Sequence, residues 1–376
     1  AKQAPDMDFE VFASNLAKGT PLGRIGTAEE FVNLACFLAS DQGSFITGTA
    51  INVDGGRVKL PAVGPRKTGR FSVKSPALLK ADGKGERFIT FTLVRKSSTA
   101  WAPASTEVAW NQFPLPSRAN TIAAEKSNAL FESSVNDAGE IQLPYGVYAP
   151  ELSLWRAPTD NDRIGHIATK WERYGVRELT RSDCTITESA KQRKVVSIWQ
   201  TSTGFEVKQT QVITPVLDGF SVKETIVVPK QLEDLARVGI NLELDGKLDT
   251  YTYFGAGPHE SYPDRKIGRV HRWVSTVAAQ YIPYVRPQEN GGHVGVRWFE
   301  LTGNDGHGVR FDLDKPRQVS VTPNRATELA DKTHDVEVVP AGTAVVHIDA
   351  AHRGVGTASC GPDTLPGFLV SGGTYS

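Results

Sequence analysis

The spacing of apolar side chains changes once along the chain, near residue 57. Before that point, residues 27–30 have the sequence of a capping box, in which a threonine and a glutamate satisfy free amides at a helix start. A helix ending near Ser40 is predicted from the apolar residues that follow at helical spacing, which are Phe31, Val32, Leu34, Ala35, Phe37 and Leu38. A short strand over residues 50–53 then ends at the turn signal of residues 54–56.

After residue 80 the apolar pattern mostly repeats every two residues, which is typical of half-buried β-strands. Alternating residues on either side of Asp218 and Gly219 predict a β-hairpin. A short helix is predicted around residues 171–174, and the proline- and glycine-rich residues 57–80 are predicted to be a linker. Many strands with few helices predict a mainly β protein, built as a sandwich or a barrel.

Composition narrows the function classes. The 376 residues suffice for two or three domains, and 42 basic side chains balance 42 acidic ones. Without a basic stripe, the sequence favours neither nucleic acid nor a membrane surface, and no apolar run approaches the ~20 residues of a membrane helix. Three distant cysteines suggest neither a disulfide framework nor a metal site, and no signal peptide is recognisable, so we expect a cytoplasmic protein.

The first 56 residues resemble the end of a short-chain dehydrogenase. The resemblance lies in Thr20-Pro-Leu-Gly-Arg-Ile-Gly26, the helix after it, and the segments 46–48 and 52–56. The chain shows no glycine-rich dinucleotide loop in a βαβ setting and no Tyr-x-x-x-Lys pair, so we expect no cofactor. A helix that lacks its sheet needs another surface to cover its apolar face, and we expect a homodimer through residues 20–56.

Residues 80–376 carry five runs that resemble the C-terminal part of a lac-type β-galactosidase of glycoside hydrolase family 2. In family order they are Glu107–Phe113, Leu154–Asp162, Tyr253–Arg265, Tyr284–Gly291 and His352–Asp363. The resemblance implies that residues 81–117 are a remnant of an immunoglobulin-like β domain. It also implies that residues 118–376 form a large antiparallel β-sandwich similar to galactose mutarotase, a supersandwich, behind a small α/β segment at residues 1–56.

The same resemblance limits which catalytic residues we expect in this chain. In the family, the catalytic glutamates and the metal ligands belong to a barrel that has no counterpart in this sequence. The final domain lends one loop to the rim of the active site, where some members place a tryptophan that stacks on the sugar. The matching position here is Cys360. Hydrolysis by this chain therefore needs another pair of carboxylates.

Glycoside hydrolysis needs one carboxyl group to protonate the leaving oxygen and a second to act as nucleophile or base. Glu260 and Glu289 are our first candidates, because each lies beside a turn fixed by proline, and His259 precedes Glu260. The other acids in these runs are Asp160, Asp162, Asp264 and Asp363.

Side chains that hydrogen-bond or stack on sugars also occur in the same runs. The predicted substrate-binding residues are Trp155, Arg156, Asp160, Asp162, His259, Tyr284, Arg286, Asn290, His293 and Cys360. A structural interpretation stands beside this one: Asp160 and Asp162 suit capping of a loop, and Asp264 with Arg265 suits an ion pair. The histidines lack the close spacing of a metal site, so no metal is predicted.

Four interpretations stay open. The first is a compact, weak β-galactosidase that uses a carboxylate pair on the concave face of the sandwich. The second is a non-catalytic module that binds galactose or β-galactosides, and the third is a mutarotase-type epimerase with one acid and one base. The fourth is an inert fusion of two unrelated C-termini.

Overall fold

The computed structural model describes residues 85–116, 135–189, 192–216, 219–357 and 363–376. The predicted N-terminal helix and strand, the linker, the dimer surface at residues 20–56 and Cys360 all lie outside the described residues. The chain divides into two units, residues 1–122 and residues 123–376.

The described part of the first unit is a β-hairpin. Strand β1 (Arg87–Val94) pairs antiparallel with β2 (Glu107–Leu115), with Arg87 opposite Leu115. Phe91 meets Phe113 edge to face, with ring centroids 6.2 Å apart. This hairpin agrees with the two-residue apolar period that predicts β-strands after residue 80.

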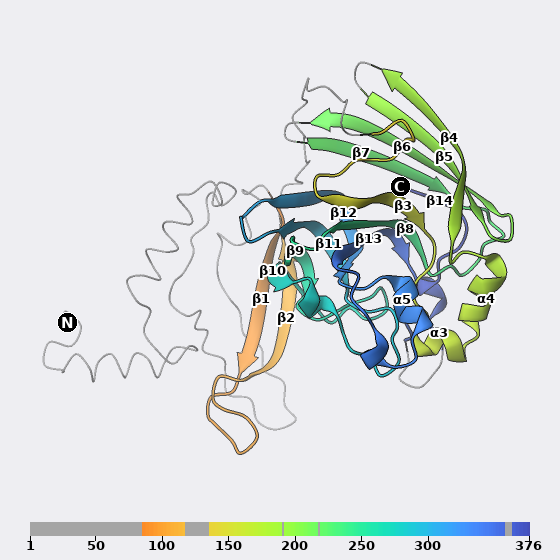
Figure 1. The fold of residues 1–376 in the computed structure, drawn as a ribbon. Helices are drawn as coiled ribbons and strands as arrows, with labels where there is room; N and C mark the ends of the chain where they lie inside the picture. The colour runs from red at the N-terminus through yellow and green to blue at the C-terminus, as the bar shows by residue number, and fades with distance from the viewer. Residues whose placement is uncertain (1–84, 117–134, 190–191, 217–218, 358–362) are drawn as a thin grey trace, which may run out of the picture. The chain divides into compact units, whose positions relative to one another are not determined.

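The second unit consists of two antiparallel sheets joined by short helices and long loops (Figure 1). One sheet has seven strands in the order β10-β9-β11-β12-β13-β8-β3, and the other has five in the order β14-β7-β6-β5-β4. The strands are β3 (Gly146–Ser153), β4 (Leu179–Ser189), β5 (Gln192–Thr201), β6 (Glu206–Val216), β7 (Gly219–Val227), β8 (Arg237–Asp245), β9 (Thr250–Gly257), β10 (Arg269–Thr276), β11 (Gly292–Thr302), β12 (Gly308–Thr322), β13 (Thr343–His352) and β14 (Thr374–Tyr375). The mainly β, antiparallel fold class is confirmed, and so is the hairpin formed by β6 and β7.

The described helical segments are α3 (Asp160–Ile164), α4 (Ile167–Tyr174), α5 (Ala326–Asp331) and the 3-10 turns η4 (Ala278–Gln280), η5 (Asp335–Glu337) and η6 (Pro366–Phe368). The helix predicted at residues 171–174 is the second half of α4. Helices α3 and α5 were not predicted. Each has six residues or fewer, which is too short to show helical periodicity.

The faces of the seven-stranded sheet differ in polarity, and this difference places the site. Leu242 of β8 pairs with Val346 of β13, and both belong to a buried apolar cluster. One residue along, Asn241 pairs with His347, which pairs in turn with Ser320 of β12. Since side chains alternate across a strand, the second face is polar. In the view of Figure 1, the five-stranded sheet lies above the seven-stranded sheet, and α3 and α5 lie below it.

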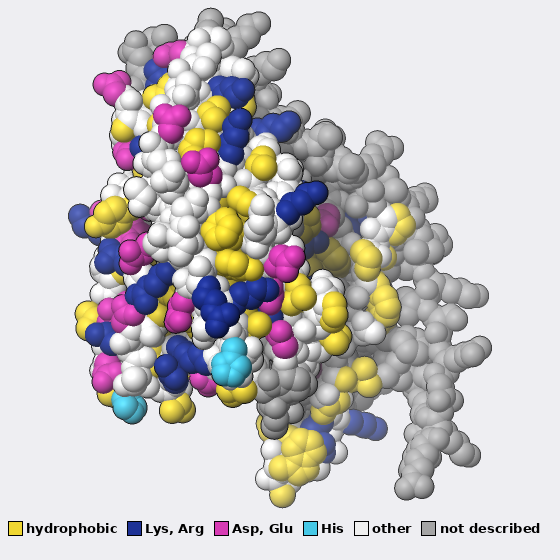
Figure 2. All heavy atoms as spheres, turned by 90° about the vertical axis from the view of Figure 1, so that its right-hand side faces the viewer, with side chains coloured by type: hydrophobic (Ala, Val, Ile, Leu, Met, Phe, Trp, Pro, Cys, Tyr) yellow, Lys and Arg dark blue, Asp and Glu magenta, His cyan; other side chains and the backbone are white. Residues whose placement is uncertain are grey.

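Charged residues on the surface are of mixed sign. Figure 2 shows a face on which Lys and Arg side chains alternate with Asp and Glu side chains. The exposed pair Arg177–Asp331, at 2.7 Å, is an example of such neighbours. No helix among the described residues is long and apolar enough to span a membrane.

Phe299 tests the apolar core of the seven-stranded sheet. Its side chain is completely buried and stacks on Phe311, with ring centroids 4.6 Å apart. We expect Phe299→Ala to lower the free energy of unfolding by ~3–5 kcal/mol, because it removes buried surface and leaves a cavity. Urea unfolding monitored by circular dichroism measures this loss. Val274→Ala, at an exposed position of β10, is the control and should stay within ~0.5 kcal/mol of the parent.

Candidate functional site

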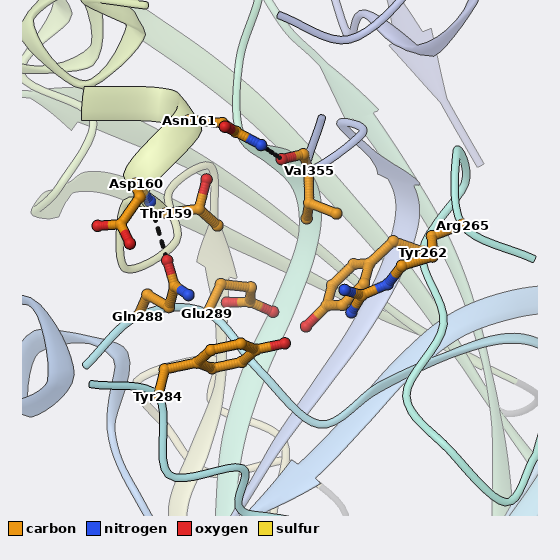
Figure 3. A pocket seen from close by; sticks show the side chains of 9 residues that line it. All are labelled: Thr159, Asp160, Asn161, Tyr262, Arg265, Tyr284, Gln288, Glu289 and Val355. Atoms are coloured by element: carbon orange, nitrogen blue, oxygen red, sulfur yellow. Dashed lines mark hydrogen bonds between the residues drawn. The ribbon is translucent and has the colours of Figure 1, made fainter. Parts of the chain in front are cut away.

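A small pocket of about 130 Å³ opens where four of the five runs that carry the β-galactosidase resemblance meet (Figure 3). It is smaller than the ~300–1,000 Å³ typical of small-molecule sites, so it suits one sugar ring or part of one. The lining residues come from the start of α3, the loops before and after β10, and the segment that follows β13. They are Thr159, Asp160, Asn161, Tyr262, Arg265, Tyr284, Gln288, Glu289 and Val355.

Glu289 forms the acidic wall of the pocket. Its Oε1 accepts a hydrogen bond of 2.7 Å from Nη2 of Arg237, and Nε2 of His352 lies 3.7 Å from the same oxygen. Burial alone would raise the pKa of Glu289. The Arg237 charge, together with the nearby His352 ring, outweighs burial and holds this pKa well below its ordinary value. Glu289 is therefore an ionised carboxylate, and its side chain is 6% exposed.

Glu260 lies just outside the pocket lining. Its Oε1 accepts hydrogen bonds from Arg265 and Tyr284, and its Oε2 accepts one of 2.9 Å from the amide of Gly291. Arg265 and Tyr284 themselves line the pocket. Glu260 thus orients two lining side chains. The ion pair considered for Asp264 and Arg265 is replaced by the pair Arg265–Glu260.

Asp264 instead closes a loop. It accepts hydrogen bonds from the amides of Val355 and Gly356, at 3.0 and 2.9 Å, and from the hydroxyl of Thr364 at 2.8 Å. Although burial alone would raise its pKa, these hydrogen bonds hold the pKa of Asp264 below its ordinary value. They attach the loop of Tyr262 to the segment of Val355, so two walls of the pocket are tied together.

Arg156 and Asp162 are a fully buried pair that holds a third wall. Arg156 donates to both carboxylate oxygens of Asp162, at 3.1 and 2.8 Å, and to the carbonyls of Arg353 and Gly354. Asp162 also accepts from the amide of Thr159 in a capping box at the start of α3. The predicted capping role of Asp162 is confirmed.

The other predicted binding residues separate into two groups. Asp160 and Tyr284 line the pocket, with Glu289. Trp155, Arg156, Asp162, His259, Arg286, Asn290 and His293 are not among the lining residues, and Glu260 is not either. Asn290 braces the loop through hydrogen bonds to Ile282 and Gln288, and the buried Trp155 has the Arg177 guanidinium 5.2 Å from its ring centroid.

Sequence reasoning did not single out Thr159, Asn161, Gln288, Val355 or Arg237. The first four belong to the recognised runs, so their places in the runs were the available signal. Arg237 lies between Ala236 and Val238 in an apolar stretch. A lone charge in a predicted buried strand suggests a buried ion pair, and that signal could have found it.

His293 is buried away from the lining. Its ring stacks on Tyr253 at 4.4 Å, its Nε2 lies 2.7 Å from Oε1 of Gln280, and its Nδ1 lies 3.2 Å from the carbonyl of Ala256. Burial lowers the pKa of His293 to about 4, so the ring is neutral at pH 7. Among the residues that the structure describes, no three His, Cys, Asp or Glu side chains gather as a metal site would require.

The buried pair Arg156–Asp162 should carry much of the stability around the pocket. We expect Asp162→Asn to lower the free energy of unfolding by ~3–5 kcal/mol, because it leaves the Arg156 charge buried without its counter-ion. Urea unfolding checks this. Asp331→Asn breaks the exposed pair with Arg177 and should cost at most ~1 kcal/mol, and equal losses in the two variants would contradict the interpretation.

His293 should make stability depend on acid. Its pKa is lower in the folded chain than the ~6.5 of an unfolded one, so the folded state binds fewer protons between pH 6.5 and 4. The contribution of His293 to stability is therefore lost as pH falls through this window. His293→Gln should lose less stability than the parent between pH 7 and pH 4.5, measured by urea unfolding. The exposed His307→Gln is the control, and equal losses in parent and His293→Gln would refute the assignment.

Comparison with known proteins supports the family resemblance that the sequence runs predict. The sequence model of a family described as beta galactosidase small chain matches residues 118–376. A model described as beta-galactosidase, domain 4 matches residues 31–116, and one described as enoyl-(acyl carrier protein) reductase matches residues 1–57. The last match fits the dehydrogenase-like tail predicted from the sequence.

Curated relatives carry the same name. A beta-galactosidase of Arthrobacter sp. (strain B7) is 29% identical over 365 residues, covering 82% of this chain and 34% of the relative. One from Priestia megaterium is 24% identical over 326 residues, covering 78% and 31%, and one from Leuconostoc mesenteroides is 32% identical over 142 residues, covering 37% and 13%.

This chain thus spans about a third of the length of the first two relatives. The match at residues 118–376 takes in both sheets of the second unit and all the pocket residues. The predicted resemblance is confirmed: the chain belongs to the beta-galactosidase small chain family.

Proposed function

We propose that the pocket binds the galactosyl group of β-galactosides. The observation that carries this proposal is the ionised, buried Glu289 carboxylate that borders the pocket. Figure 3 shows the Glu289 carboxylate and the phenol groups of Tyr262 and Tyr284 turned toward one space. Charged acceptors form strong hydrogen bonds with hydroxyl groups, and aromatic faces cover the apolar side of a sugar ring.

The side of the pocket formed by α3 supplies further polar contacts. Asp160 donates its amide to Oε1 of Gln288 at 2.9 Å, which leaves the Gln288 amide nitrogen as a donor for a ligand. Asn161 donates to the carbonyl of Val355 at 2.9 Å and fixes the opposite rim. Donors and acceptors on a braced wall match the alternating hydroxyl groups of a sugar.

The hydrogen bonds and ion pairs of Glu260 and Glu289 favour binding over hydrolysis. A glycosidase needs one carboxyl group that carries a proton for the leaving oxygen. Arg237 keeps Glu289 ionised, and Glu260 accepts hydrogen bonds from three donors, two of them side chains of the pocket. Neither carboxyl group is arranged as a proton donor.

Hydrolysis is the second candidate, and it was the first interpretation of the sequence. The names of the curated relatives favour it, and an ionised Glu289 has the charge that a nucleophile needs. In this scheme Glu260 is the general acid and turnover is weak. A mutarotase-type epimerase needs an acid and a base beside a free sugar, and polarimetry with α-galactose distinguishes it.

Isothermal titration calorimetry with lactose and galactose tests the binding proposal. We expect Tyr284→Phe to weaken binding about 2- to 10-fold, because it removes a hydroxyl group from the lining, and Glu289→Gln about 10- to 100-fold, because it replaces the charged acceptor by a neutral amide. Asp331→Asn, away from the lining, should bind like the parent. Absence of binding by the folded parent, or unchanged affinity in both pocket variants, would refute the proposal.

A chromogenic β-galactoside separates binding from turnover. If the pocket only binds, purified protein from a host without its own β-galactosidase should bind lactose and release no chromophore. Turnover that co-elutes with the protein, and disappears in both Glu260→Gln and Glu289→Gln, would instead establish hydrolysis by this pair.

A further inference from the structure

Arg237 lies beneath the pocket between two carboxylates. Its Nη2 donates to Oε1 of Glu289 at 2.7 Å, whereas its Nε lies 3.8 Å from Oδ1 of Asp349, too far for a hydrogen bond. All three side chains are at least nine-tenths buried. Nε and Nη1 of Arg237 and Oδ1 of Asp349 have no hydrogen-bond partner among the described residues.

The strand register brings Asp349 to this position. Asp349 of β13 pairs with Gly239 of β8, two residues beyond Arg237. A Cβ atom on Gly239 would lie only 2.4 Å from Oδ1 of Asp349, so the glycine leaves the space that the carboxyl group occupies. On the other side, Gln318 of β12 donates its amide to the carbonyl of Ser261 rather than to Asp349. Among the described residues, Arg237 is the cation that forms an ion pair with Asp349.

Among the described buried groups around Arg237, Asp349 is the one whose pKa lies near neutral pH. Burial raises the pKa of Asp349 to about 7, with Glu289 adding to the rise and Arg237 and Arg156 opposing it. Burial lowers the pKa of His352 to about 4 and the pKa of His347 well below its ordinary value, so both rings are neutral at pH 7.

These groups approach Asp349 from different elements. Arg237 comes from β8, Glu289 from the loop before β11, and Arg156 from the segment after β3. The two histidines come from β13 itself and interact with Arg237 and Glu289. The neutral Gln318 faces it from β12. Near pH 7, the Arg237 guanidinium is therefore shared by the ionised Glu289 carboxylate and by Asp349, which takes up or releases a proton.

We propose that Asp349 is a positioning residue for the pocket, which acts on Glu289 through the Arg237 guanidinium that the two acids share. The inference rests on the proposed role of Glu289 in binding galactosides. When Asp349 is protonated, Arg237 pairs with Glu289 alone and neutralises it. When Asp349 is ionised, it attracts Nε of Arg237, and Glu289 becomes a stronger acceptor for ligand hydroxyl groups.

Galactoside affinity should therefore rise as pH increases through neutrality. Calorimetry with lactose between pH 5.5 and 8.5 should show a rise of about tenfold, which corresponds to a fall of one unit in the pKa of Asp349 on binding. Asp349→Asn imitates the protonated acid, so its affinity should be independent of pH and equal to the parent's affinity at low pH.

Glu243→Gln is the matched control. Glu243 is also a buried acid, on β8, but its hydrogen-bond partners are Arg325 and Thr343. This variant should keep the pH dependence of the parent. A flat profile in the parent, or the same slope in Asp349→Asn as in the parent, would overturn the inference and leave the binding proposal intact.

A measurement without ligand decides the coupling even if the pocket binds no galactoside. The infrared carbonyl band that disappears in Asp349→Asn reports protonated Asp349, and its pH titration gives a midpoint. In Glu289→Gln this midpoint should fall by about one unit or more, because Arg237 then serves Asp349 alone and the Glu289 charge is gone. An unchanged midpoint would overturn the inference, whereas absence of lactose binding at every pH would refute only the binding proposal.

Discussion

The pocket depends on buried arginines that are paired with carboxylates. Arg156, Arg237 and Arg353 are among the largest completely buried side chains, and each forms an ion pair with at least one acid. The pocket walls are largely loops and helix ends, whose backbones need fixed partners. Arg156 supplies two such contacts by donating to the carbonyls of Arg353 and Gly354, which directly precede the lining residue Val355. Without these guanidinium groups, the segments that line the pocket would lack the contacts that align them.

A buried charge is a costly way to align loops, and this cost has consequences. Removing an ion from water carries a penalty of several kcal/mol, which a well-placed partner offsets only in part. Apolar side chains could fill the same volume with equal or greater stability, but they would not fix the direction of a carboxylate. The arrangement of Arg237 and Glu289 gives up stability for a charged acceptor at a defined place. A site that recognises hydroxyl groups requires such an acceptor, because sugars offer hydrogen bonds and little apolar surface.

The sequence predicted the local features better than the long-range ones. Alternation of apolar residues predicted the antiparallel sheets and the β6–β7 hairpin, because a period of two can be recognised from a few consecutive residues. The recognised runs contain all the pocket residues, and two of the predicted binding residues, with Glu289, line the pocket. The role of Arg237 could not be predicted in this way. Its partners Glu289 and His352 are 52 and 115 residues away. His352 reaches it because β13 pairs with β8, and Glu289 reaches it from the loop before β11.

The same long-range order explains why the two glutamates that sequence patterns treat alike have different surroundings. Glu260 and Glu289 each lie beside a proline-containing turn, and each is bound by an arginine. Arg265, the partner of Glu260, is five residues away in the same loop and lines the pocket itself, so Glu260 acts on the pocket through other side chains. Arg237, the partner of Glu289, comes from the seven-stranded sheet and does not line the pocket. The Glu289 carboxylate therefore borders the pocket itself. The direction from which the cation approaches, rather than the identity of the acid, decides which carboxylate a ligand can reach.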